Sequence, residues 1–188
     1  LPYILDNVLA EGKGVPFIAV LNNGLVRGPD DRDIDDFTGI EGVITRDCRN
    51  LVESKYRTKT DKWSRAIAGL SYGSMQACYI GFRHPELFGS VGSFTYLRRR
   101  NIDNTYAANP HLNILRDAEK FQKHYKLLFR SMGGEERHMN EFLEDDAFLA
   151  ESGIDVLDSH VRRIYPGQTH TWNCWRRALY DFAQMVFR

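Results

Sequence analysis

The sequence lacks an excess of charge of either sign. Its 188 residues carry 25 Lys and Arg against 25 Asp and Glu, so no overall field draws the chain toward nucleic acid or an anionic membrane surface. It also lacks an apolar run near the roughly 20 residues that cross a bilayer, and its first residues show no secretory signal pattern. We therefore expect a soluble protein that binds neither nucleic acid nor membranes.

Cysteine is also scarce. Cys48, Cys78 and Cys174 are odd in number, widely spaced and embedded in apolar helical patterns. This distribution favours small buried side chains over disulfides or a metal site.

One acidic run, residues 29–36, resembles the start of an EF-hand loop, because Asp31, Asp33 and Asp35 match its first calcium ligands. The match fails later, where Asp36 replaces the required glycine and Gly42 the required glutamate. We predict a solvated loop, and neither a metal nor another cofactor.

With 43% hydrophobic residues the chain can bury one sizeable core, so we expect a single domain over 1–188. Apolar runs that suit strands alternate with stretches of helical periodicity. This alternation is typical of an α/β fold with a mainly parallel sheet. The expected strands are 15–21, 65–70, 90–94, 126–132 and 160–165, and the expected helical stripes include residues 43–52 and 175–186.

The segment R-A-I-A-G-L-S-Y-G-S-M-Q at 65–76 is the most informative motif. An apolar strand pattern enters G-L-S-Y-G, and a helical pattern leaves it, which predicts a nucleophile elbow with Ser71 at its tip. Small residues are expected two positions to either side, at Gly69 and Gly73, to avoid backbone clashes in so tight a turn. The alternative is a glycine-bracketed turn that carries an ordinary serine.

A nucleophilic serine needs a general base, which in this arrangement comes last in the chain. Among the six histidines, only His170 lies in a loop directly after the final expected strand. In that loop Gly167 lets the backbone bend, and Trp172 and Trp175 can shield the imidazole from water. We therefore predict His170 as the base.

The acid that orients the base is expected after the strand at 126–132. The loop there reads G-G-E-E-R-H and offers Glu135 and Glu136. One of them should accept the Nδ1 proton of His170. Position alone does not choose between them.

These residues carry a family resemblance that extends over nearly the whole chain. The sequence resembles the esterase D-like branch of the α/β hydrolases, which holds feruloyl and acetyl-xylan esterases, enterochelin esterases and mycolyltransferases. The resembling segments are L-P-Y-I-L-D-N-V-L-A-E-G, R-A-I-A-G-L-S-Y-G-S-M-Q-A, F-R-H-P-E-L-F-G-S-V-G-S-F and H-T-W-N-C-W-R-R-A-L-Y-D-F.

The resemblance implies a three-layer α/β/α hydrolase and a serine esterase that releases feruloyl or acetyl groups from plant polysaccharide, in a secreted or periplasmic setting. The family's acid loop usually reads G-x-x-D, which places the acid on Glu136, as Glu instead of Asp, with Glu135 as the alternative. Trp172, Met75 and Arg98 are the candidate substrate contacts. A small-molecule or carbohydrate ester is the expected partner.

The sequence departs from the family at its start. The family has further strands and an H-G-G loop before the helix that corresponds to residues 1–12, and the backbone N–H of that loop completes the oxyanion hole. Here only the Tyr72 N–H matches a donor, so we expect an N-terminally truncated form. Loss of one oxyanion donor costs about 3 to 4 kcal/mol of transition-state stabilisation, or roughly 100- to 1000-fold in rate.

Two alternatives stay open. The first is a siderophore esterase or an acyltransferase of the same fold, in which Arg98, Arg99 and Arg100 contact an anionic ligand, although a solvated basic turn is the more common role of such a run. The second is a carbohydrate-binding remnant without catalysis.

Overall fold

The computed structural model describes residues 1–27, 33–34, 37–97 and 110–188. Four parallel strands form its main sheet, in the order β3-β4-β5-β6. They are β3 (Ala66–Leu70), β4 (Ser90–Phe94), β5 (Leu127–Gly133) and β6 (His160–Tyr165). Two short strands, β1 (Val26–Arg27) and β2 (Asp33–Ile34), pair antiparallel apart from it.

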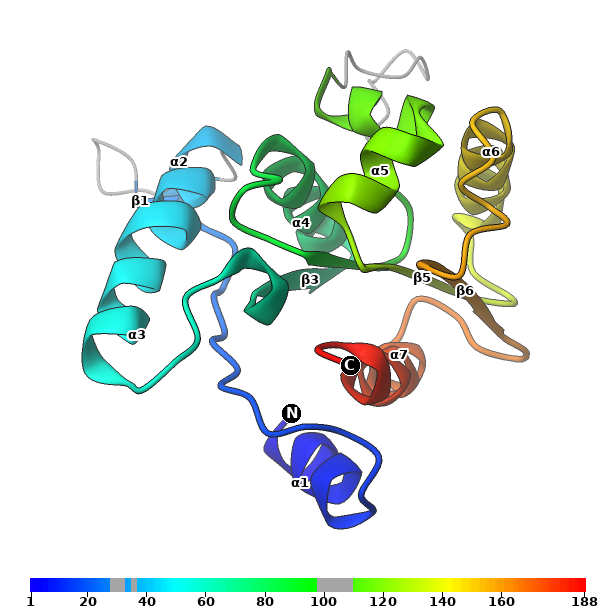
Figure 1. The fold of residues 1–188 in the computed structure, drawn as a ribbon. Coiled ribbons are helices and arrows are strands. Elements are labelled where there is room, and N and C mark those ends of the chain that lie inside the picture. Colours follow the sequence, from blue (N-terminus) through cyan, green and yellow to red (C-terminus); the bar gives the residue numbers. More distant parts are fainter. Residues whose placement is uncertain (28–32, 35–36, 98–109) are drawn as a thin grey trace.

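Helices lie on both faces of the main sheet, as Figure 1 shows: α4, α5 and α6 on one face, and α7 with α1 beyond it on the other. The segment from α2 to α3 is helical throughout, with a π-helical turn, η1, in its middle. The helices are α1 (Pro2–Ala10), α2 (Phe37–Gly42), η1 (Val43–Cys48), α3 (Arg49–Lys55), η2 (Lys62–Ser64), α4 (Tyr72–Arg83), η3 (Pro110–Arg116), α5 (Ala118–His124), α6 (Met139–Ala150) and α7 (Trp172–Met185).

Each face of the sheet buries its own apolar cluster. Successive side chains of a strand point to opposite faces, and in β5 Leu128 joins the cluster under α4 and α5 while Leu127 and Phe129 join the cluster under α7. This burial on both faces explains why β4 and β5 read as mostly apolar runs, whereas the edge strand β6 carries the exposed Arg162 and Arg163. The α/β class expected from the sequence is confirmed, and four of the five expected strands lie within one residue of their predicted bounds.

The prediction of a fifth strand over residues 15–21 was wrong. This segment forms no strand, and Ile18, Val20 and Leu21 are 49%, 56% and 69% exposed. An apolar run becomes a buried strand only when a neighbour accepts its backbone hydrogen bonds. In the part of the chain that the structure describes, β3 pairs with β4 alone, and no strand pairs with residues 15–21.

The remaining sequence predictions have mixed outcomes. Cys78 and Cys174 are buried and Cys48 is partly exposed, all as free thiols. Asp31, Asp35 and Asp36 lie outside the described residues, so the solvated loop at 29–36 stays a prediction. Among the helices that the structure describes, none is long and apolar enough to cross a membrane.

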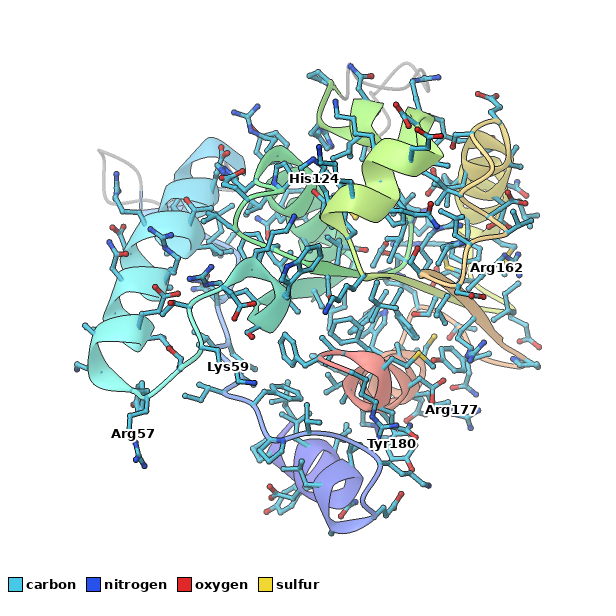
Figure 2. The ribbon with its side chains drawn as sticks, in the orientation of Figure 1. Arg57, Lys59, His124, Arg162, Arg177 and Tyr180 are labelled. Atoms are coloured by element: carbon cyan, nitrogen blue, oxygen red, sulfur yellow. The ribbon has the colours of Figure 1, made fainter. Side chains whose placement is uncertain are left out.

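A buried arginine links the sheet to α6. Arg130 of β5 has no exposed surface, and its Nη1 donates to Asp146 at 2.8 Å while its Nη2 donates to the carbonyl of Phe142 at 3.0 Å. Arg162 of β6 also donates to Asp146, from the solvent side, where Figure 2 shows it at the edge of the sheet. The buried cation therefore holds α6 against two neighbouring strands.

We expect Arg130→Leu to lower the free energy of unfolding by about 3 kcal/mol or more, because it leaves the Asp146 carboxylate without its buried partner. The matched control is Arg162→Leu, which removes a half-exposed partner of the same carboxylate and should cost less than about 1 kcal/mol. Urea denaturation of both variants measures the difference. Equal losses would show that burial of Arg130 does not govern this link.

Candidate active site

Ser71 occupies a one-residue turn between β3, which ends at Leu70, and α4, which begins at Tyr72. Its backbone has φ 52° and ψ −124°, a conformation that side-chain-bearing residues rarely adopt. Strain of this kind costs on the order of 1–3 kcal/mol and persists where the surroundings enforce it. The turn has the geometry of a nucleophile elbow, with the serine at its tip.

The two glycines that flank Ser71 differ in their steric role. A Cβ on Gly69 would collide with the backbone of Gly73 and lie 2.8 Å from the amide nitrogen of Ser74. A Cβ on Gly73 would meet no described atom within 4 Å. The expectation that both residues must be small to avoid clashes was therefore wrong for Gly73. The backbone of Gly73 lies against Gly69, but the position of its own Cβ is open.

His170 lies against Ser71. Its Nε2 is 2.8 Å from the Oγ of Ser71 across 99 residues of sequence. The loop that carries it turns at Gly167, whose φ is +69°, and Trp175 of α7 packs edge-on to the imidazole with ring centroids 4.8 Å apart. The turn and the indole together fix the ring plane.

Glu136, and not Glu135, contacts the histidine. The Nδ1 of His170 donates to Oε2 of Glu136 at 2.8 Å. The Glu136 side chain is 1% exposed, whereas Glu135 is exposed. The other oxygen, Oε1 of Glu136, is buried and has no hydrogen-bond partner within the described residues. Among the described residues, the hydrogen bond of this side chain is thus made to His170 through Oε2.

Backbone contacts between the β5 and β6 loops set this geometry. The N–H of Glu135 donates to the carbonyl of Gln168 at 2.9 Å, and the N–H of Gly134 to the carbonyl of Tyr165 at 2.8 Å. A Cβ on Gly133 would collide with the Gln168 carbonyl. Glycine at 133 therefore lets the acid loop touch the base loop.

Comparisons with known proteins identify the family of this chain. The model of the family described as "Putative esterase" matches residues 41–184, a span that includes Ser71, Glu136 and His170. The chain belongs to this esterase family. The fold is accordingly an α/β-hydrolase fold.

Members and neighbours of the esterase family are similar over nearly all of this chain. It is 31% identical over 192 residues to an endo-1,4-beta-xylanase/feruloyl esterase of Xylanibacter ruminicola. The matched region covers 98% of this chain but only 23% of the length of the Xylanibacter protein. A ferulic acid esterase structure covers 99% of it, with 76% of its own length matched, at TM-score 0.71 and 21% identity. The feruloyl esterase module of Clostridium thermocellum, complexed with sinapinate, covers 98%, with 68% of its length matched, at TM-score 0.66 and 17% identity.

In this esterase-family chain Tyr72 is the first residue of α4. Backbone N–H groups in the first turn of a helix point out of its N-terminal end, where the helix dipole favours negative charge. The Tyr72 amide therefore lies in the right element to face an oxyanion that develops beside Ser71.

The three candidate substrate contacts fall in different environments. Trp172 is 68% exposed and packs edge-on against Trp175, with ring centroids 5.4 Å apart, so it contacts the indole that borders His170 and not the imidazole. Met75 is 9% exposed in α4. Arg98 lies outside the described residues, as do Arg99 and Arg100.

Sequence reasoning missed His138. Its ring packs against His170 with centroids 5.7 Å apart and against Tyr96 at 5.1 Å. A cavity of about 330 Å³ borders the same region and is lined by residues of both loops: Glu135, Glu136, Arg137, Thr169 and His170. No motif marks a lone histidine before a helix, so only the fold reveals this neighbour.

The buried thiols do not compete with Ser71. Burial, with Asp145 nearby, raises the pKa of Cys78 to about 12, and burial, with Glu136 nearby, raises the pKa of Cys174 to about 11. Both side chains are therefore neutral near pH 7, and a thiol in that form is a poor nucleophile.

The two glycines of the elbow give a matched pair of substitutions. Gly69→Ala should lower the free energy of unfolding by at least about 2 kcal/mol, because its Cβ meets immovable backbone. Gly73→Ala should change it by no more than about 1 kcal/mol, in the stabilising direction, because a helical glycine gains from a side chain. Urea unfolding of both variants tests this, and equal destabilisation would contradict it.

Proposed function

We propose that this chain is a serine carboxylic ester hydrolase that releases acyl groups, feruloyl or acetyl, from plant polysaccharide. The observation that carries the proposal is the continuous pair of 2.8 Å hydrogen bonds from Ser71 through His170 to Glu136. Nucleophile, base and orienting acid in that order form the arrangement that activates a serine hydroxyl.

The proposed reaction has two halves. Ser71 Oγ attacks the ester carbonyl while His170 Nε2 takes its proton, and the carbonyl oxygen becomes an oxyanion that the Tyr72 N–H stabilises. Collapse breaks the bond to the sugar oxygen, to which His170 returns the proton. Water then attacks the acyl carbonyl while His170 takes a proton from it. The bond between the acyl group and Ser71 Oγ breaks as His170 returns that proton to the serine, and the acyl group leaves as a carboxylic acid. Glu136 keeps the proton of His170 on Nδ1 throughout.

The substrate class rests on the relatives. The Xylanibacter ruminicola protein is named for both xylanase and feruloyl esterase activity, and the Clostridium thermocellum module holds sinapinate, an aromatic acid. Because this chain spans about a quarter of the Xylanibacter protein, the feruloyl assignment is tested with a panel of esters that differ only in the acyl group. Methyl ferulate and methyl acetate provide the first comparison.

The kinetic test separates the two glutamates. Glu136→Gln should lower kcat on the order of 10⁴-fold, because the amide cannot hold His170 in the required tautomer. Glu135→Gln should leave kcat within about twofold, since its exposed side chain does not touch His170. Steady-state kinetics on the best ester of the panel measures both, and a large loss at Glu135 with none at Glu136 would overturn the assignment.

The base has its own test. His170→Ala should lower turnover by several orders of magnitude with an unchanged circular dichroism spectrum, because Ser71 then has no group to accept its proton. Unchanged turnover would remove His170 from the mechanism. A folded wild-type chain that binds xylan oligosaccharides and cleaves no ester would instead support a carbohydrate-binding role.

A further inference from the structure

A second cavity, of about 670 Å³, lies between the outer face of α7, the end of β6 and α1. None of Ser71, His170 and Glu136 lines it. We call it the α7 cleft. Its volume lies within the roughly 300–1,000 Å³ of small-ligand sites and exceeds what a bare inorganic anion fills.

The charge of the α7 cleft is positive. Arg176 and Arg177 line it, against the single carboxylate of Asp181, which already accepts a hydrogen bond from the Tyr165 hydroxyl at 2.9 Å. The nearby carboxylate of Glu11 is neutralised by Lys13 at 2.8 Å. An anionic ligand is therefore favoured.

The polar groups of the cleft leave donors for such a ligand. The guanidinium of Arg177, which Figure 2 shows projecting from α7, has no hydrogen-bond partner among the described residues. Arg176 donates to Oδ1 of Asn173. Because Asn173 accepts this bond through its oxygen, its amide N–H groups take no part in it. Guanidinium groups bind carboxylates in a planar, bidentate manner, and side-chain amides suit sugar hydroxyls.

One wall of the cleft supplies an apolar surface. Ile4 of α1 and the ring of Tyr180 lie there, and the Tyr180 hydroxyl is held by Glu11 at 2.6 Å and Lys13 at 2.9 Å. A fixed ring beside an aliphatic side chain suits the C–H face of a pyranose, which a simple anion lacks. The cationic and apolar features of the cleft together suit a sugar acid, which has both a carboxylate and a C–H face.

The cleft shares a loop with the proposed base. Gln168 lines the cleft, its carbonyl accepts from the Glu135 N–H, and His170 follows two residues later. The lining of the cleft and the proposed base are therefore two residues apart on one loop.

We propose that the α7 cleft binds a uronic acid branch of the polysaccharide, with Arg176 and Arg177 on its carboxylate and Asn173 and Gln168 on its hydroxyls. The choice of a plant polysaccharide rests on the proposed function. The cleft itself is a separate site that binds the polysaccharide without taking part in ester cleavage.

The test uses calorimetric titration of the Ser71→Ala chain, so that hydrolysis does not enter, with xylo-oligosaccharides that carry one glucuronic acid branch and with the matching neutral oligosaccharides. The acidic ligand should bind more tightly. Arg176→Ala with Arg177→Ala should weaken its binding by about tenfold or more, the loss expected for charged hydrogen bonds. Arg57→Ala, an exposed arginine at the distant end of α3, is the matched control and should bind as before.

Three outcomes would overturn the proposal. The first is equal binding of acidic and neutral oligosaccharides. The second is a double variant that binds the acidic oligosaccharide as tightly as its parent does. The third is displacement of that oligosaccharide by inorganic phosphate and acetate as readily as by free glucuronic acid. Thermal unfolding of each variant shows whether it is folded.

Catalysis is measured apart from binding. With an active Ser71, the double arginine variant should cleave methyl ferulate at the parent rate and lose activity only on acidic xylan. Ester cleavage without selective binding keeps the proposed function and rejects the cleft. Selective binding without ester cleavage keeps the cleft and rejects the proposed function.

Discussion

The contact between the loops that follow β5 and β6 is the constraint on which the site depends. His170 makes its two 2.8 Å hydrogen bonds only if the acid loop and the base loop lie within backbone hydrogen-bond distance. Adjacent parallel strands bring these loops together, and Gly133 removes the Cβ that would keep them apart. The same sheet maintains the strained backbone of Ser71, because β3 precedes this residue, α4 follows it, and both elements are packed into the core.

Much of this arrangement is predictable from local sequence patterns. Buried parallel strands read as apolar runs, so β4 and β5 are visible before the fold is known, and the short runs of β3 and the edge strand β6 fall at the expected places in the alternation with helices. Chain order and strand ends then select Ser71 and His170, since the carboxyl ends of parallel strands share one edge of a sheet. Local pattern does not separate Glu135 from Glu136. That choice depends on which side chain the turn after Gly133 buries, a property of two loops in contact.

The remaining features could not be predicted because they depend on distant partners. Residues 15–21 have the composition of a buried strand, yet strand formation needs a neighbour, and only Val15 and Phe17 among them are partly buried. His138, which precedes α6, packs against His170 across the fold, and Trp175 packs against the imidazole while Trp172 packs against Trp175. The α7 cleft combines residues of the consecutive elements β6 and α7 with Ile4 of α1, which lies at the opposite end of the sequence.

The central claim is that Ser71 is activated by His170. Labelling with a fluorophosphonate probe tests it most directly, because the probe reacts with activated serines and spares ordinary ones. The account predicts modification of the 188-residue chain at Ser71, located by mass spectrometry, and its loss in both Ser71→Ala and His170→Ala. A folded wild-type chain that stays unlabelled, or a His170→Ala chain that labels at the wild-type rate, would contradict it.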